Sequence, residues 1–226
     1  MEIRVKEHRR RQFDRGALID KLKSMMGTPV VPEQTAWRKI SKRSVDIIWA
    51  GGSLLLFCLP MLVVALMVKL TSRGPVIYWS DRIGRNNKTF SMPKFRTMRT
   101  DTPPVATHLM EHPENYLTPI GEFLRKSSLD ELPQLFSVIK GDMSVVGPRP
   151  ALFNQDDLVK LRTERGIHLL TPGVTGWAQM NGRDELPIPA KVSLEEFYLR
   201  HQSFLLDMKI LFATFVKVMR RAGVSH

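Results

Sequence analysis

A stretch without a single charged side chain, from Ile47 to Val68, constrains this sequence more than any other feature. These 22 residues would form a straight α-helix of roughly 33 Å, close to the roughly 30 Å hydrocarbon thickness of a bilayer. The alternative is a buried core helix, but an uncharged core helix of this length is unusual in a chain of 226 residues. The stretch therefore predicts a membrane-associated fold.

Basic residues lie on both sides of this stretch. They are Arg38, Lys39, Lys42 and Arg43 before it, and Lys69, Arg73, Arg82, Arg85 and Lys88 after it. Positive charge favours the cytoplasmic side of a membrane, and Pro60 in the middle of the stretch predicts a kinked helix. Residues 37–72 are therefore expected to form a re-entrant hairpin that returns to the face it entered. A straight span with a tolerated proline is the alternative.

The rest of the chain divides into two further parts. Residues 1–36 form a basic N-terminal extension with a short amphipathic helix around 15–25, and residues 73–226 form a small cytoplasmic domain of mixed α/β (α+β) class. Local patterns predict strands at 76–79 and 89–98, helices at 120–125, 130–139 and 154–164, a Gly-rich loop at 170–182, and helices over 194–221. The apolar stripe of the last segment fits either the membrane interface or the domain core.

The net charge of +12 calls for an anionic partner. Nucleic acid, an anionic membrane surface and a phosphorylated substrate all satisfy that requirement. A nucleic-acid-binding protein is expected to interleave basic and aromatic residues in a groove, whereas here the basic residues flank a membrane segment. We therefore expect anionic lipids and no nucleic acid. A non-catalytic membrane scaffold is a further alternative. The single cysteine, Cys58, excludes an internal disulfide.

An adjacent carboxylate pair, Asp130 and Glu131, is the first candidate for chemistry. Ser128 and Glu131 have the spacing of a capping box, and Pro133 suits a first helical turn. The pair is thus expected at a helix N-terminus, which would keep Asp130 ionised. Ionised carboxylates can act as a nucleophile and as a ligand for a hard cation. Acidic residues are also common at helix starts for stability alone, so the pair needs further support.

Cationic side chains supply that support. They are Lys94 and Arg96, expected on one face of a strand, Arg125, five residues before Asp130, and Arg149, held between Pro148 and Pro150. Guanidinium groups bind phosphate through paired hydrogen bonds, and cations neutralise phosphate oxygens that would otherwise repel an anionic nucleophile. Together with the carboxylates, this set is typical of phosphoryl transfer.

Several motifs in a fixed order resemble the bacterial sugar transferases, also called monotopic phosphoglycosyl transferases. They are GPVIY at 74–78, RIGR at 82–85, KFRTM at 94–98, LRKSSLDELPQ at 124–134, GDMSVVGPRP at 141–150, PGVTGWAQMNGR at 172–183 and LDMKI at 206–210. The resemblance runs from about Trp37 to the C-terminus.

The resemblance implies a reaction in which a UDP-sugar and a polyprenyl (undecaprenyl) phosphate give a polyprenyl diphosphate sugar and UMP, early in exopolysaccharide or lipopolysaccharide synthesis. It implies that Asp130 forms a covalent phosphosugar and that Glu131, with Asp207, binds Mg²⁺. The implied substrate-binding residues are Lys94, Arg96, Arg125, Pro148, Arg149, Pro150, Gln179, Asn181 and Arg183. The implied location is the bacterial inner membrane, with the active site facing the cytoplasm. The sugar and the oligomeric state stay open, a homodimer included.

Overall fold

The computed structural model describes residues 36–103, 110, 112–182 and 186–219. The predicted amphipathic helix around residues 15–25, nearly all of the basic extension, and Arg183 lie outside the described residues. The elements below belong to one compact unit that begins at Gln34.

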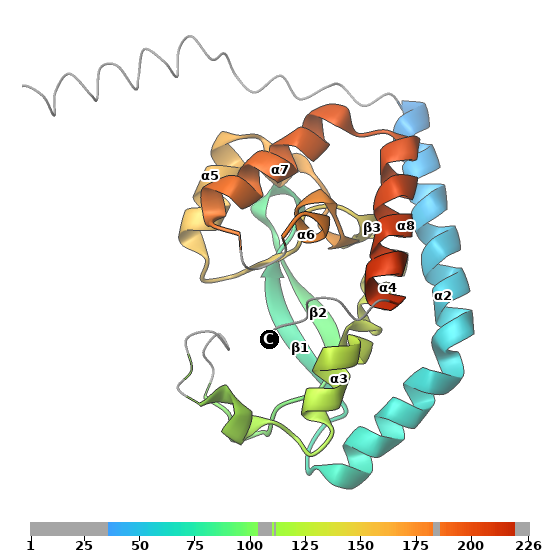
Figure 1. Ribbon diagram of the computed structural model, residues 1–226, viewed down its shortest axis with the longest axis vertical. Helices are drawn as coiled ribbons and strands as arrows, with labels where there is room; N and C mark the ends of the chain where they lie inside the picture. Colours follow the sequence, from blue (N-terminus) through green and yellow to red (C-terminus); the bar gives the residue numbers. More distant parts are fainter. Residues whose placement is uncertain (1–35, 104–109, 111, 183–185, 220–226) are drawn as a thin grey trace, which may run out of the picture. The chain divides into compact units, whose positions relative to one another are not determined.

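Helix α2 (Ala36–Thr71) contains the whole uncharged stretch and has Pro60 inside it. It is long and apolar enough to cross a membrane, and only 11% of its most apolar 18-residue window is buried. Its most exposed side chains in that window include Leu55, Leu56 and Leu59. Figure 1 shows that α2 changes direction in its second half, the half that contains Pro60. The described helix is therefore bent, but it does not fold back on itself as a hairpin.

Strands β1 (Ile77–Ile83) and β2 (Thr89–Phe95) form the antiparallel hairpin that carries Lys94. The predicted first strand, 76–79, is too short because its polar continuation stays paired as far as Ile83, opposite Thr89. The connecting turn, Arg85–Asn87, holds Asn86 and Asn87 at φ 58°, a conformation that asparagine tolerates better than most residues. Strand β4 (Ala151–Leu152) pairs with the other edge of β1, giving the order β2-β1-β4.

The remaining elements include a second, two-stranded parallel sheet. Its strands are β3 (Ser144–Val146) and β5 (Gly173–Thr175), the latter inside the predicted loop 170–182. The helices are α3 (Gly121–Ser127), α4 (Gln134–Lys140), α5 (Asp156–Glu164), α6 (Trp177–Met180), α7 (Ile188–His201) and α8 (Phe204–Met219), with short 3-10 turns at Pro113–Tyr116, Leu129–Glu131 and Ile167–Leu169. Helix α7 thus begins earlier than predicted.

Both ends of α2 are attached to the same domain. Near its C-terminal end, Val64 and Val68 share a buried apolar cluster with Phe95 of β2 and Leu124 of α3. Near its N-terminal end, Arg43 donates hydrogen bonds of 2.6 and 2.5 Å to the carbonyls of Val138 and Ile139, which end α4. These contacts place the domain along the length of α2 (Figure 1).

Candidate active site

Glu131 lies at the centre of the predicted cationic cluster. Its Oε1 accepts hydrogen bonds from Lys94 Nζ at 2.9 Å and from Arg149 Nη2 at 3.1 Å. Although burial opposes ionisation, Lys94 and Arg149 hold the pKa of Glu131 well below its usual range. Strand β2 and the Pro-Arg-Pro turn, far apart in the sequence, therefore meet at one carboxylate whose ionised form they favour.

The neighbouring Asp130 is 8% exposed and has a different electrostatic balance. Burial raises the pKa of Asp130 to about 6, and the adjacent Glu131 charge raises it as well, while Lys94, Arg125 and Arg149 oppose the increase. Asp130 is thus a buried carboxylate that ionises near neutral pH, surrounded by three cations. Perturbed carboxylates of this kind are typical of catalytic sites.

The predicted helix N-terminus around this pair is wrong. Asp130 and Glu131 lie in the 3-10 turn Leu129–Glu131, and α4 begins only at Gln134. Ser128 adopts a left-handed conformation and makes no capping hydrogen bond, and Glu131 points to Lys94 and Arg149 instead of capping a helix. Desolvation, and not a helix dipole, therefore dominates the pKa of Asp130.

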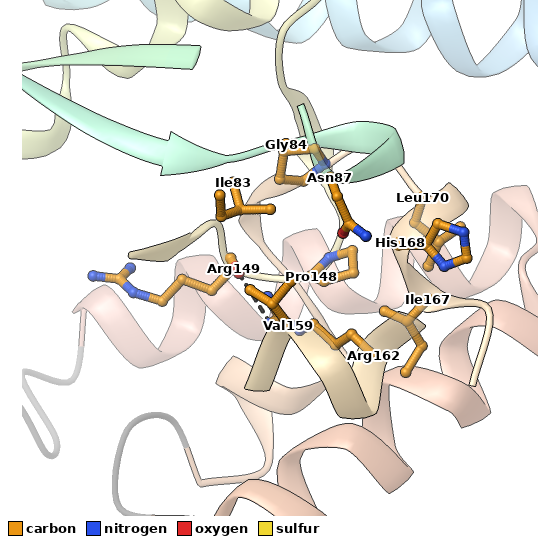
Figure 2. A pocket seen from close by; sticks show the side chains of 11 residues that line it. Ile83, Gly84, Asn87, Pro148, Arg149, Val159, Arg162, Ile167, His168 and Leu170 are labelled. Carbon is orange, nitrogen blue, oxygen red and sulfur yellow. Dashed lines mark hydrogen bonds between the residues drawn. The ribbon is translucent and has the colours of Figure 1, made fainter. Parts of the chain in front are cut away.

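Backbone contacts fix the Pro-Arg-Pro turn that carries Arg149. The carbonyl of Pro148 accepts from the Gly173 amide at 2.8 Å, that of Arg149 from Arg162 Nη2 at 3.0 Å, and that of Pro150 from Arg82 Nη1 at 3.5 Å. Figure 2 shows the Arg149 side chain extending away from a pocket behind the turn, while its carbonyl faces Arg162. Apolar side chains such as Ile83 and Val159 line much of this pocket, which does not include the carboxylate pair.

Arg96 makes its hydrogen bonds outside the carboxylate cluster. It is 4% exposed, and its guanidinium donates to the carbonyls of Ser72, Pro75 and Met98 and to the Ser72 hydroxyl. Arg96 therefore joins the end of α2 to the strand region. Arg125 lies closer to the predicted place: its Nε donates to Thr97 Oγ1 at 3.1 Å, and its charge acts on Asp130.

Asp207 belongs to another buried cluster. Its Oδ2 accepts from Lys42 Nζ at 2.8 Å and its Oδ1 from the Tyr198 hydroxyl at 2.7 Å. Asp207 and Glu131, the two predicted Mg²⁺ ligands, are thus engaged by different cations: Asp207 by Lys42, and Glu131 by Lys94 and Arg149. Within the described residues, no group of three or more His, Cys, Asp or Glu side chains is arranged to hold a metal ion.

The Gly-rich motif places its two described candidates differently. Gln179 is 8% exposed, and its buried amide nitrogen and oxygen have no hydrogen-bond partner in the structure. The amide lies beside Gly176, where a Cβ atom would approach Gln179 Oε1 to 2.6 Å and the Gly147 carbonyl to 2.1 Å. Asn181 is exposed and donates to the Trp177 carbonyl at 2.7 Å. Gln179 therefore lies under the start of the Pro-Arg-Pro turn, whereas Asn181 ends α6.

Sequence reasoning missed a second layer of residues around the site. Arg162 and Glu195 form a buried ion pair, with Arg162 Nε and Glu195 Oε2 2.8 Å apart, and the Tyr198 hydroxyl donates to the Val146 carbonyl at 3.3 Å. Lys42, interpreted above as a membrane-flanking charge, also reaches Val146 O at 3.0 Å. Arg162 and Glu195 are 33 residues apart, so no local pattern indicated the pair.

Comparison with known proteins identifies the family of this chain. Residues 37–221 match the bacterial sugar transferase family. The chain is 37% identical to UDP-glucose:undecaprenyl-phosphate glucose-1-phosphate transferase of Escherichia coli, over 91% of this chain and 47% of that protein. It is 42% identical to undecaprenyl-phosphate glucose phosphotransferase of Komagataeibacter xylinus, over 79% of this chain and 36% of that protein. It is also 36% identical to the exopolysaccharide production protein ExoY of Rhizobium meliloti, over 85% of this chain and 93% of that protein.

The chain belongs to the bacterial sugar transferase family. It spans half or less of the first two relatives and nearly all of the third. The family assignment made from the motifs is confirmed.

Proposed function

We propose that this protein transfers a sugar phosphate from a UDP-sugar to a polyprenyl phosphate, releasing UMP and forming a polyprenyl diphosphate sugar. The observation that carries the proposal is the buried Asp130, which lies beside an ionised Glu131 among Lys94, Arg125 and Arg149. Two relatives are named for the transfer of glucose phosphate to undecaprenyl phosphate, which supports the same reaction class here.

In the proposed first step, a carboxylate oxygen of Asp130 attacks the sugar-bearing phosphorus. A bond forms between Asp130 and phosphorus, the bond to the bridging oxygen breaks, and that oxygen leaves with UMP. In the second step, an oxygen of the polyprenyl phosphate attacks the same phosphorus and Asp130 leaves as a carboxylate. Neither step needs an oxidant or a reductant. The three cations favour both steps because they neutralise the phosphate oxygens as charge redistributes.

Mg²⁺ fits this site in part. Glu131 offers carboxylate oxygens next to the nucleophile, and hard cations prefer oxygen ligands. We therefore assign Glu131 as the protein ligand, with substrate phosphate oxygens completing the coordination, as magnesium sites in phosphoryl-transfer enzymes commonly do. When bound, Mg²⁺ would neutralise charge on the diphosphate. Asp207 is left out of this set because Lys42 and Tyr198 already occupy its oxygens.

The proposed membrane placement is re-entrant, with both ends of α2 on the cytoplasmic face. One small domain holds the N-terminal part of α2 through Arg43 and its C-terminal part through Val64 and Val68. A true span would separate these contacts by a bilayer about 30 Å thick. Helix α8 buries Ile210 but exposes its large apolar side chains, which suits the interface of an anionic membrane; they are Phe204, Leu205, Phe212 and Phe215.

Cysteine labelling tests this topology. Cys58 is replaced by serine, and single cysteines are then introduced at Lys39 and Arg73. With a membrane-impermeant maleimide on inside-out vesicles, both sites are expected to react. On right-side-out spheroplasts, neither is expected to react. Labelling of the two positions from opposite faces would establish a transmembrane span and refute re-entry.

UMP release across a panel of UDP-sugars tests the reaction. With the sugar that supports turnover, intact-protein mass spectrometry in the absence of lipid should show one added phosphosugar, mapping to Asp130. Asp130→Asn should abolish both the adduct and UMP release, because it removes the anionic oxygen. Glu131→Gln is the matched neighbour: it should slow turnover without moving the labelled site. An adduct elsewhere, or turnover without any adduct under rapid quench, would contradict the covalent route.

A further inference from the structure

Arg149 is held by its surroundings at two points besides its contact with Glu131. At the start of its turn, the Val146 carbonyl accepts from Lys42 Nζ at 3.0 Å. The Tyr198 hydroxyl donates mainly to Asp207 at 2.7 Å and shares its proton with the Val146 carbonyl at 3.3 Å. At Arg149 itself, the carbonyl accepts from Arg162 Nη2 at 3.0 Å, and the guanidinium of Arg162 is in turn paired with Glu195. The contact between Arg149 and Arg162 is visible in Figure 2.

The two points of attachment lead back to one helix. Glu195 and Tyr198 are three residues apart on α7, so they lie on the same face, and each is 2% exposed. Arg162, on α5, is 7% exposed and connects Glu195 to the turn. Misalignment of these buried hydrogen bonds is costly, because a buried polar group that loses its partner cannot bind water in its place.

From these contacts we infer that Glu195 and Tyr198 are positioning residues, which act through Val146 and Arg162 to hold Arg149 against Glu131. The inference rests on the proposed function for its kinetic consequence, because Arg149 is assigned there to the phosphate groups. Its structural content, that α7 fixes both ends of the segment from Val146 to Arg149, can be tested without turnover.

Tyr198→Phe is the principal variant, because it keeps the ring and deletes only the hydroxyl that reaches Val146 and Asp207. Glu195→Gln is the second variant; it keeps the shape but removes the charge that pairs with Arg162. The matched control is Glu196→Gln. Glu196 pairs with Arg165 at 2.7 Å, so it too joins α7 to the C-terminal end of α5. Among the described residues, however, Arg165 forms no hydrogen bond with the turn that carries Arg149.

The first measurement is hydrogen exchange of the full-length protein in detergent, followed by mass spectrometry. The Gly147 amide donates to the Thr175 carbonyl at 2.8 Å, so its protection reports on the order of the turn. We expect about tenfold faster exchange in the peptide over 144–152 for Tyr198→Phe and Glu195→Gln, and wild-type exchange for Glu196→Gln. Unchanged exchange in both α7 variants, with the fold intact, would overturn the inference whether or not the protein turns over a UDP-sugar.

The second measurement is a double-mutant cycle on turnover. Tyr198→Phe is expected to lower kcat about tenfold, because small displacements of a charge-stabilising group are costly, and to change KM much less. In an Arg149→Ala background, the same substitution should have less than about a twofold effect, since its target is gone. Equal effects in both backgrounds would show that Tyr198 does not act through Arg149. A wild-type protein that turns over no UDP-sugar would instead refute the proposed function, and the exchange experiment would still decide the role of α7.

Discussion

Replacing Asp130 by asparagine should stabilise the folded protein while abolishing its activity. Burial raises the pKa of Asp130 from the ordinary 3.8 to about 6, so at neutral pH the fold holds a carboxylate that is easier to ionise in the unfolded chain. The folded pKa is the higher one. At a pH above both pKa values, the carboxyl is ionised in the folded and in the unfolded state. Folding is then opposed by the cost of burying the charge.

The size of this effect follows from the gap between the two pKa values. About two pH units correspond to about 3 kcal/mol, so Asp130→Asn should raise the free energy of unfolding by up to about 3 kcal/mol at pH 8. For a chain of this length that is an increase in Tm of about 6 to 12 °C. At pH 4 the carboxyl is protonated in the folded state and only about half ionised in the unfolded chain, so the gain should fall below about 1 kcal/mol.

Thermal unfolding of the detergent-solubilised protein, followed by tryptophan fluorescence between pH 4 and pH 8, measures the gain. Asp157→Asn is the control, because Asp157 is exposed at the start of α5 and should change stability by less than about 1 kcal/mol at either pH. A gain that is equal at pH 4 and pH 8, or a loss of stability at pH 8, would show that the burial of Asp130 does not oppose folding.

Three further outcomes follow from the same site. The initial rate should fall to about one tenth between pH 7.5 and pH 5, because a nucleophilic Asp130 must be ionised; a flat pH–rate profile would contradict this. Lys94→Met should move the acid limb of that profile to higher pH, since Lys94 is the cation that most favours ionised Asp130, whereas Lys94→Arg should leave it nearly in place. Arg96→Ala should cost about 3 kcal/mol of stability by leaving buried carbonyls unpaired, measured as a fall in Tm; full stability with lost turnover would restore its predicted substrate role.

Local sequence patterns predicted the parts of the site that depend on neighbours in the chain. The uncharged stretch became α2, Lys94 lies on strand β2, and Arg149 lies in the turn between two prolines. The predicted alternation failed at the next basic residue. Strand β2 ends at Phe95, so the pattern of alternating faces stops before Arg96, which turns towards the end of α2.

The buried polar contacts could not be predicted in this way. Asp207 pairs with Lys42 across 165 residues, and Arg162 pairs with Glu195 across 33. Each member has an ordinary local setting, in a helix or beside an apolar stretch, and only tertiary packing gives it a partner. The capping-box interpretation failed for a related reason: the cations of two distant segments compete for Glu131 more strongly than a helix terminus does.

The pairing of Lys42 with Asp207 has a consequence for biogenesis. A ribosome adds about 5 to 20 residues per second, so roughly 10 to 30 s pass between the synthesis of the two residues. Throughout that interval Lys42 has Asp46 one helical turn away, 4.0 Å distant in the finished fold, so nascent α2 has a counter-ion for Lys42 before Asp207 is made. We expect a nascent chain that stops before α8 to hold α2 through Arg43, Val64 and Val68 but to lack the pair between Lys42 and Asp207. Helix α8 then adds a further attachment at the N-terminal end of α2.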